Sequence, residues 1–107
     1  MVKISILYPN KPDRRFDWQY YEHTHMPRSI ELLSQHTGYL GVSVERGMGG
    51  AIPGTEATFV AICHFTFRSL EAFLEAFRPH AVELQGDMSA YTDVEPIIQV
   101  NEVVISH

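Results

Sequence analysis

The sequence predicts an α+β fold of the ferredoxin-like type, a βαββαβ chain whose two helices cover one face of a four-stranded antiparallel sheet. Two observations lead to this prediction. Stretches with a two-residue hydrophobic period, typical of strands, alternate with two stretches of helical spacing in the order β, α, β, β, α, β. The chain has 107 residues and is 45% hydrophobic, so we expect a single domain over residues 1–107 with its own core.

The first strand is predicted over Val2–Tyr8, where Ile4, Ile6 and Tyr8 alternate with Lys3, Ser5 and Leu7 and so give the strand two distinct faces. Pro9 ends this strand, because it has no N–H for a sheet ladder. The polar segment that follows, residues 9–15, is expected to be a loop.

The first helix begins near Asp17, a typical N-cap residue, and carries Trp18, Tyr21 and His25 at spacings of three and four, which places them on one face. Pro27 cannot donate a backbone hydrogen bond and its ring clashes with the preceding turn, at a cost of about 3 kcal/mol inside a helix. We therefore predict a kink or a break beside His25. Helical character then resumes until Gly38.

Two strands follow, over about Leu40–Met48 and Ala57–Phe67, with a flexible connection at residues 49–54. The second of them has hydrophobic residues on both alternations, which indicates that both of its faces are at least partly covered.

A second helix begins at Ser69, carries an apolar stripe, is interrupted at Pro79 and is expected to resume through Val82 and Leu84. The last strand is predicted over Val94–Ile105, with Pro96 near its start, where a missing donor is tolerable.

One layer of helices leaves the other face of the sheet uncovered. Since strands two to four carry apolar side chains on both alternations, we expect a second copy of the sheet to cover that face, which makes the protein a homodimer through its sheet faces.

The composition excludes several classes of partner. A net charge of −5 with only eight Lys and Arg gives no basic face for nucleic acid or for an anionic membrane. No apolar run approaches the roughly 18 residues of a membrane span, and the N-terminus is too short and too alternating for a signal peptide. The only cysteine, Cys63, is expected to be a buried and inert thiol. We expect a soluble cytoplasmic protein.

The segment FDWQYYEHTHMP, residues 16–27, concentrates the candidate chemistry. His25 is the leading candidate, because an imidazole exchanges protons near neutral pH, and Tyr21 one turn earlier is placed to orient it or to donate to a substrate oxygen. The alternatives are that His25 only bonds a carbonyl freed by Pro27, and that Tyr21 is a core aromatic with a satisfied hydroxyl.

Further residues are candidates for a ligand pocket, each with a structural alternative. Tyr8 and Tyr91 stand at the ends of elements, where aromatic rings also close cores, and Trp18 belongs to the aromatic helix face. His64 in its apolar strand is either a pocket residue or a hydrogen-bonded core histidine. Arg46 either binds an anionic group or forms a surface or dimer ion pair.

His80 and Asp87 are the last pair of candidates, since a carboxylate beside an imidazole fixes its tautomer and raises its basicity. The sequence leaves open whether these two residues meet, and the alternatives are a helix cap for Asp87 and a surface position for His80.

No metal or cofactor is predicted. His23 and His25 point about 200° apart on a regular helix, so they share an ion only if the helix is broken there. GMGGAIPG lacks the dinucleotide-binding pattern and precedes a strand rather than a helix, and neither a phosphate loop nor a nucleophile elbow occurs.

The motifs YY and HTHMP in the first helix resemble those of the EthD family, and the resemblance extends through MVKISILYPN, VSVERGMGG, SLEAFLEAF and HAVELQGDMSAYTDVEPIIQV to nearly the whole chain. It implies a dimeric α+β barrel related to muconolactone isomerases, cofactor-free monooxygenases, polyketide cyclases and haem-binding proteins. His25, His80 and Asp87 stand at positions that look familial. No histidine stands out as a haem ligand.

Two functional hypotheses follow. In the first, an apolar cavity beside the helix holds a small hydrophobic or aromatic organic molecule, and His25 moves a proton in an isomerisation, a cyclisation or a cofactor-independent oxidation. In the second, the cavity only binds or delivers such a molecule as an accessory of a degradation pathway, such as that of ethyl tert-butyl ether. A filled core without a ligand is the structural alternative.

Overall fold

A computed structural model describes all 107 residues, Met1–His107. The chain runs through β1 (Val2–Pro9), α1 (Trp18–Tyr20), a π-helical turn (Tyr21–His25), α2 (Met26–Leu33), β2 (Tyr39–Arg46), β3 (Phe59–Phe67), α3 (Leu70–Phe77), a 3₁₀ turn (Arg78–His80), α4 (Ala81–Gly86), a second 3₁₀ turn (Met88–Ala90) and β4 (Ile97–Glu102). This order confirms the predicted ferredoxin-like α+β fold.

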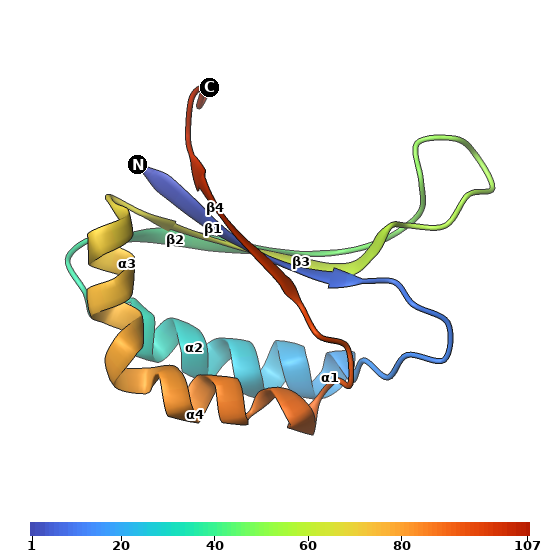
Figure 1. Cartoon of the computed structure of the whole chain (residues 1–107), viewed down its shortest axis with the longest axis horizontal. Coiled ribbons are helices and arrows are strands. Elements are labelled where there is room, and N and C mark those ends of the chain that lie inside the picture. The colour runs from blue at the N-terminus through green and yellow to red at the C-terminus, as the bar shows by residue number, and fades with distance from the viewer.

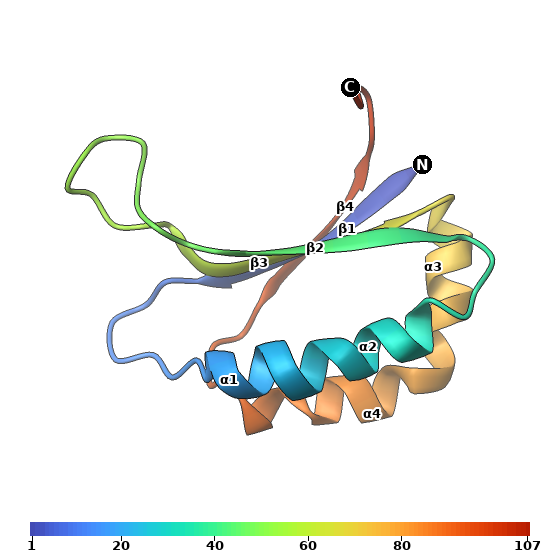
Figure 2. The same cartoon turned by 180° about the vertical axis from the view of Figure 1, so that it is seen from behind.

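The four strands form one antiparallel sheet in the order β2-β3-β1-β4. Both central strands are rich in β-branched and aromatic residues. All the helices lie on one side of the sheet, and the opposite side has no helical cover (Figures 1 and 2). In Figure 1, α1 and α2 run as one continuous rod beside α4. No helix combines the length and the apolar character that crossing a lipid bilayer requires.

The core lies between the sheet and the helices. Ile4 and Tyr8 of β1 and the alternate residues Cys63, Phe65 and Phe67 of β3 are all buried, as the two-residue period predicts. α3 packs closely against the segment that leads into β2. A Cβ on Gly38 in that segment would lie only 2.5 Å from the Cβ of Ala72 in α3. Glycine is therefore required at position 38 by packing.

Several predicted boundaries are wrong. The first helix ends at Leu33 rather than at Gly38, and the chain then turns through His36, whose Nδ1 accepts the N–H of Gly38 at 2.9 Å. The last strand covers only Ile97–Glu102; its neighbour β1 begins at Val2, opposite Glu102, and one further backbone bond, from the N–H of Val103 to the carbonyl of Met1, follows. The connection between β2 and β3 is likewise longer than predicted, residues 47–58.

Pro27 does not break the helix. Instead, the chain widens into the π-helical turn just before it, where the N–H of Met26 bonds the carbonyl of Tyr21, five residues back. Pro27 then stands in the first turn of α2, a position that tolerates its missing N–H. The predicted irregularity beside His25 is thus a π-turn inside a continuous helix.

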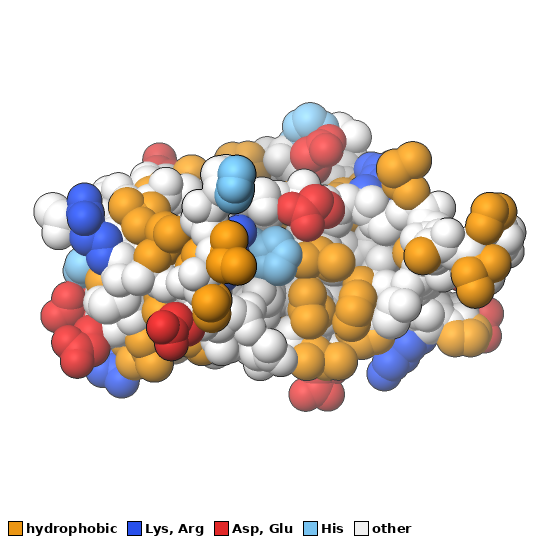
Figure 3. Space-filling model, turned by 90° about the horizontal axis from the view of Figure 1, so that it is seen from above, with side chains coloured by type: hydrophobic (Ala, Val, Ile, Leu, Met, Phe, Trp, Pro, Cys, Tyr) orange, Lys and Arg blue, Asp and Glu red, His pale blue; other side chains and the backbone are white.

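The uncovered sheet face is only partly apolar, which corrects the expectation of an apolar face (Figure 3). Ile62 and Ile97 point to it, but its centre holds a polar network. Ser5 bonds Nδ1 of His64 at 2.7 Å and accepts from Asn101 at 2.9 Å, while Nε2 of His64 lies 3.8 Å from Glu45. This network crosses all four strands.

Candidate functional site

A cavity of about 100 Å³ lies between the helices and the sheet, and 13 of its 16 lining residues are hydrophobic. The three other lining residues are His25, Ser29 and Gln85, and Tyr8, Tyr21 and Tyr91 are among the hydrophobic ones. Two lining residues are exposed, Ile98 on the edge strand β4 and Gln85 on α4, so the cavity opens between these two elements. An apolar hollow with a few converging polar atoms is the usual form of a small-molecule site.

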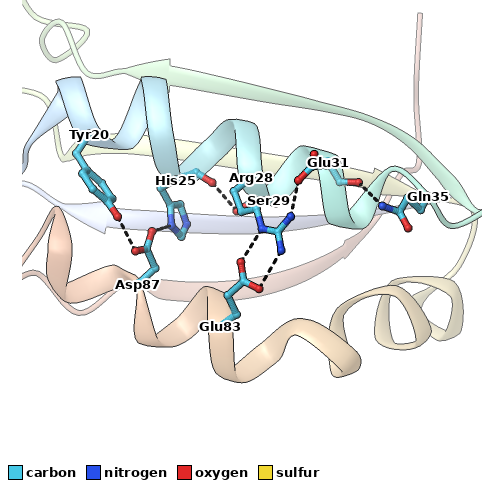
Figure 4. A network of polar contacts seen from close by, with 8 residues as sticks. All are labelled: Tyr20, His25, Arg28, Ser29, Glu31, Gln35, Glu83 and Asp87. Atoms are coloured by element: carbon cyan, nitrogen blue, oxygen red, sulfur yellow. Dashed lines mark hydrogen bonds and ion pairs between the residues drawn. The ribbon is translucent and has the colours of Figure 1, made fainter.

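His25 stands in the π-turn with only 8% of its surface exposed. Its Nδ1 lies 2.9 Å from Oδ2 of Asp87, so Nδ1–H donates to the carboxylate (Figure 4). Nε2 is left as an acceptor on the cavity side, where the Tyr91 hydroxyl lies 3.5 Å away. The carboxylate thus fixes which nitrogen is free to take a proton.

Asp87 has a second partner that the sequence analysis missed. The Tyr20 hydroxyl donates to Oδ1 of Asp87 at 2.7 Å, and this bond raises the pKa of Tyr20 (Figure 4). Asp87 comes from the far end of α4, and Arg28 of α2 binds Glu83 one turn earlier through two nitrogens, at 2.7 and 3.2 Å. These contacts fix α4 against α2 and hold the carboxylate in place.

Two tyrosines close the inner end of the site. The hydroxyls of Tyr8 and Tyr91 lie 2.7 Å apart. Burial raises the pKa of Tyr8 to about 12 and raises that of Tyr91 as well, so both phenols are neutral at physiological pH. Tyr21 stacks on the imidazole of His25, with ring centroids 5.8 Å apart and ring planes 14° from parallel. The imidazole therefore has a fixed orientation.

His25, Tyr21, Tyr8 and Tyr91 all line the cavity, as the sequence analysis proposed for a common site. The alternative in which the His25 side chain bonds a freed carbonyl is not observed, because its ring nitrogens face Asp87 and Tyr91. The backbone carbonyl of His25 accepts from Ser29 instead, at 3.0 Å.

The side chain of Asp87 does not cap a helix, because its two carboxylate oxygens accept hydrogen bonds from Tyr20 and His25. Its imidazole partner is His25 and not His80, which lies half-buried at the start of α4 without a hydrogen bond to Asp87. His80 and Asp87 therefore do not meet, a question that the sequence leaves open. Asp87 supports the cavity from outside it.

Three other candidates lie elsewhere. Trp18 is outside the cavity, beneath the guanidinium of Arg46, whose central carbon lies 4.4 Å from the indole centroid. Arg46 thus makes a cation–π contact within the chain, and the predicted ion pair across a dimer stays a prediction. His64 belongs to the polar network of the uncovered sheet face and does not reach the cavity.

Cys63 lines the cavity but is not poised as a nucleophile, because burial raises the pKa of its thiol to about 12. Nowhere do three or more His, Cys, Asp or Glu side chains lie close enough together to hold a metal ion. His23 points to the surface and pairs with Glu22 at 3.2 Å, away from His25.

Comparison with known proteins gives a family match. Residues 12–95 match the model of the EthD domain. An EthD-like protein from Ralstonia eutropha JMP134 shares 36% identity over 99% of this chain and 94% of its own, with a TM-score of 0.91. An ethyl tert-butyl ether degradation (EthD) family protein from Bacillus halodurans C-125 shares 24% over 97% and 99%, with a TM-score of 0.70.

A more distant likeness is to SnoaB, a cofactor-independent oxygenase from Streptomyces nogalater, with 14% identity over 99% of this chain and 97% of that chain, and a TM-score of 0.57. At this identity the likeness concerns the fold alone. Among curated proteins, no significant match is found.

Proposed function

We propose that this chain, which belongs to the EthD family, binds a small organic molecule in its apolar cavity and uses His25 as a proton acceptor and donor. The reaction is a cofactor-independent isomerisation, cyclisation or oxygenation. The observation that carries the proposal is the position of His25, whose Nδ1 is held by Asp87 at 2.9 Å while Nε2 faces the cavity.

This geometry supports a general base. When Nε2 takes a proton from the ligand, the imidazole becomes a cation, and the carboxylate of Asp87 stabilises that charge. The apolar wall excludes water, so the charge interactions inside are stronger than in solution. A positioned base of this kind accelerates proton transfer by about 10²- to 10⁴-fold.

The test is proton exchange by the purified chain in D₂O. A panel of compact uncharged carbon acids, such as cyclic ketones and resorcinol, is followed by ¹H NMR for loss of carbon-bound hydrogen. We expect exchange faster than in buffer for at least one compound, and a loss of that acceleration in His25→Ala. His23→Ala is the matched control, because His23 lies on the same turn but faces solvent.

Melting temperatures of both variants, measured alongside, show whether the fold is intact. Exchange that survives in a folded His25→Ala variant removes His25 from the mechanism.

The second candidate function, a non-catalytic accessory protein that holds a hydrophobic metabolite for a pathway such as ether degradation, is favoured by the predominance of apolar lining. It predicts saturable binding without any exchange.

The proposal includes a homodimer through the uncovered sheet faces. Ile97 of β4 points to this face and is 52% exposed, an unusual exposure for a hydrophobic strand residue in a monomer. Sedimentation of the purified chain tests this assembly. A cytoplasmic location is also part of the proposal, and the reduced thiol of Cys63 is compatible with it.

A further inference from the structure

We propose that the cavity selects an uncharged, compact hydroxy compound, an alcohol, phenol or enol, that donates its hydroxyl hydrogen to Nε2 of His25 and accepts from the hydroxyl of Tyr91. This inference rests on the proposed function and specifies the ligand of the same site. Three features of the cavity carry it: its hydrogen-bonding atoms, its lack of charge and its size.

The hydrogen bond at Nε2 of His25 is long. Nδ1–H of His25 is used by Asp87, so Nε2 needs a donor. The only hydroxyl near it, that of Tyr91, is 3.5 Å away, at the limit of a hydrogen bond, and is also 2.7 Å from the Tyr8 hydroxyl. Nε2 therefore lacks a strong partner.

A ligand hydroxyl supplies what is missing. Its hydrogen goes to Nε2, and its oxygen accepts from Tyr91 when Tyr8 in turn donates to Tyr91. A ketone or an ether can only accept, so it leaves Nε2 without a donor, and a hydrocarbon satisfies neither atom. The site thus presents one acceptor and one donor side by side, which is the complement of a hydroxyl group.

Charged ligands are disfavoured. None of the lining residues is Lys, Arg, Asp or Glu, and Arg28 lies outside the cavity in its pair with Glu83. The same burial that raises the pKa of Tyr8 to about 12 opposes any ligand anion in this space. A carboxylate or a phosphate would lose its hydration without gaining a cation, and an ammonium ion would gain no carboxylate.

The ligand is also small. The cavity of about 100 Å³ is smaller than the engineered cavity of about 150 Å³ that binds benzene. Met26 and Met88 form part of its wall, and unbranched methionine side chains can shift to admit a somewhat larger guest. One six-membered ring with small substituents is the upper limit that this wall allows.

Three fluorinated probes separate these features in a ¹⁹F NMR titration of the purified chain: 4-fluorophenol, fluorobenzene and 4-fluorobenzoate. We expect 4-fluorophenol to bind saturably and about five- to tenfold more tightly than fluorobenzene, the effect of one net hydrogen bond. 4-Fluorobenzoate is expected to show no saturable binding.

Because Tyr91→Phe removes the donor of this pair and leaves the acceptor Nε2 of His25, we expect it to reduce the preference for 4-fluorophenol over fluorobenzene by about two- to threefold without abolishing it. Tyr39→Phe is its matched control, because Tyr39 packs on Phe67 outside the cavity, and it should leave the ratio unchanged. The wild-type comparison of the three probes remains decisive if Tyr91→Phe does not fold.

Equal affinity of the wild-type chain for 4-fluorophenol and fluorobenzene overturns the inference while leaving the proposed function intact, and so does tighter binding of 4-fluorobenzoate. Failure of all three probes to bind overturns both.

Discussion

The carboxylate of Asp87 accepts two hydrogen bonds, from Tyr20 at 2.7 Å and from His25 at 2.9 Å, and the substitution Asp87→Asn removes its charge at nearly constant volume. An amide has one oxygen and one NH₂ group, so it can accept from only one of the two donors. If the amide oxygen faces His25, Tyr20 must turn its hydroxyl hydrogen to solvent.

The expected cost in stability follows from this geometry. A hydrogen bond to a charged group contributes about 1.5–3 kcal/mol when buried. The Asp87 side chain is 31% exposed and the His25 side chain 10%, so solvent weakens the contribution, and we expect a loss of about 1–2 kcal/mol for Asp87→Asn. For a chain of 107 residues this corresponds to a melting temperature lower by about 4–10 °C.

The double-mutant cycle with Tyr20→Phe isolates the tyrosine contact. Because Tyr20 acts on the stability through Asp87, the two losses should not add, and we expect a coupling free energy of about 0.5–1 kcal/mol in urea unfolding. Additive losses would mean that the observed hydrogen bond makes no net contribution.

The effect on proton exchange distinguishes a catalytic support from a purely structural contact. Loss of the carboxylate behind the imidazole should slow exchange by about 10- to 100-fold, the usual scale for removal of a group that orients a reactive histidine. Glu75→Gln is the control, since it also removes a carboxylate bound to a histidine, His36 at 3.0 Å, but neither of these residues lines the cavity. A folded Asp87→Asn variant with undiminished exchange would refute the role assigned to Asp87.

Three further predictions concern pH, reactivity and packing. Burial raises the folded-state pKa of Tyr8 to about 12 and that of Tyr91 above its usual value, so their contribution to stability is complete below about pH 10 and is lost as the pH rises toward the folded pKa. In an absorbance titration, the two phenols should therefore ionise only as the chain unfolds. Ionisation of both in a chain that is still folded would contradict this prediction. Cys63, whose thiol pKa burial raises to about 12, should react with a disulfide reagent at pH 8 much more slowly in the folded chain than in urea, and equal rates would show that it is accessible. Gly38→Ala should destabilise the fold by about 1–3 kcal/mol, because the new Cβ would lie 2.5 Å from that of Ala72, and the compensating change Ala72→Gly should recover part of the loss in thermal unfolding.

The arrangement of strands and helices could be predicted because the signals that encode it are local. In β3, the alternation of buried Cys63, Phe65 and Phe67 with half-buried neighbours is visible in seven consecutive residues. Strand ends are different, since they depend on the partner strand. Nothing near Glu102 marks it as the last residue of β4, which lies opposite Val2 at the start of β1, near the other terminus.

The sequence indicates most of the residues around the cavity, Tyr8, Tyr91 and Asp87 among them, but not the contacts of Asp87 with His25 and Tyr20. Tyr21 and His25 share a helix face, and spacing alone indicates that they lie together. Asp87 is 62 residues from His25, and its approach depends on how α4 packs against α2, so the sequence leaves its imidazole partner open. Tyr20 gives no such signal, because neighbouring residues on a helix face different directions and the sequence offers no sign that the surface side of this helix meets a carboxylate.

The π-turn explains why one helix can line the cavity over its whole length. Tyr21, His25, Ser29 and Leu33 all line the cavity and recur at a strict spacing of four residues. In a regular α-helix each such step rotates the side chain by about 40°, so these three steps would move Leu33 about 120° away from Tyr21. The additional residue that the π-turn accommodates reverses this by about 100° and returns the four side chains to one face. Cavity-lining residues at every fourth position over three successive steps are therefore the sequence signal of this turn. Pro27 alone predicts a broken helix and does not indicate a π-turn.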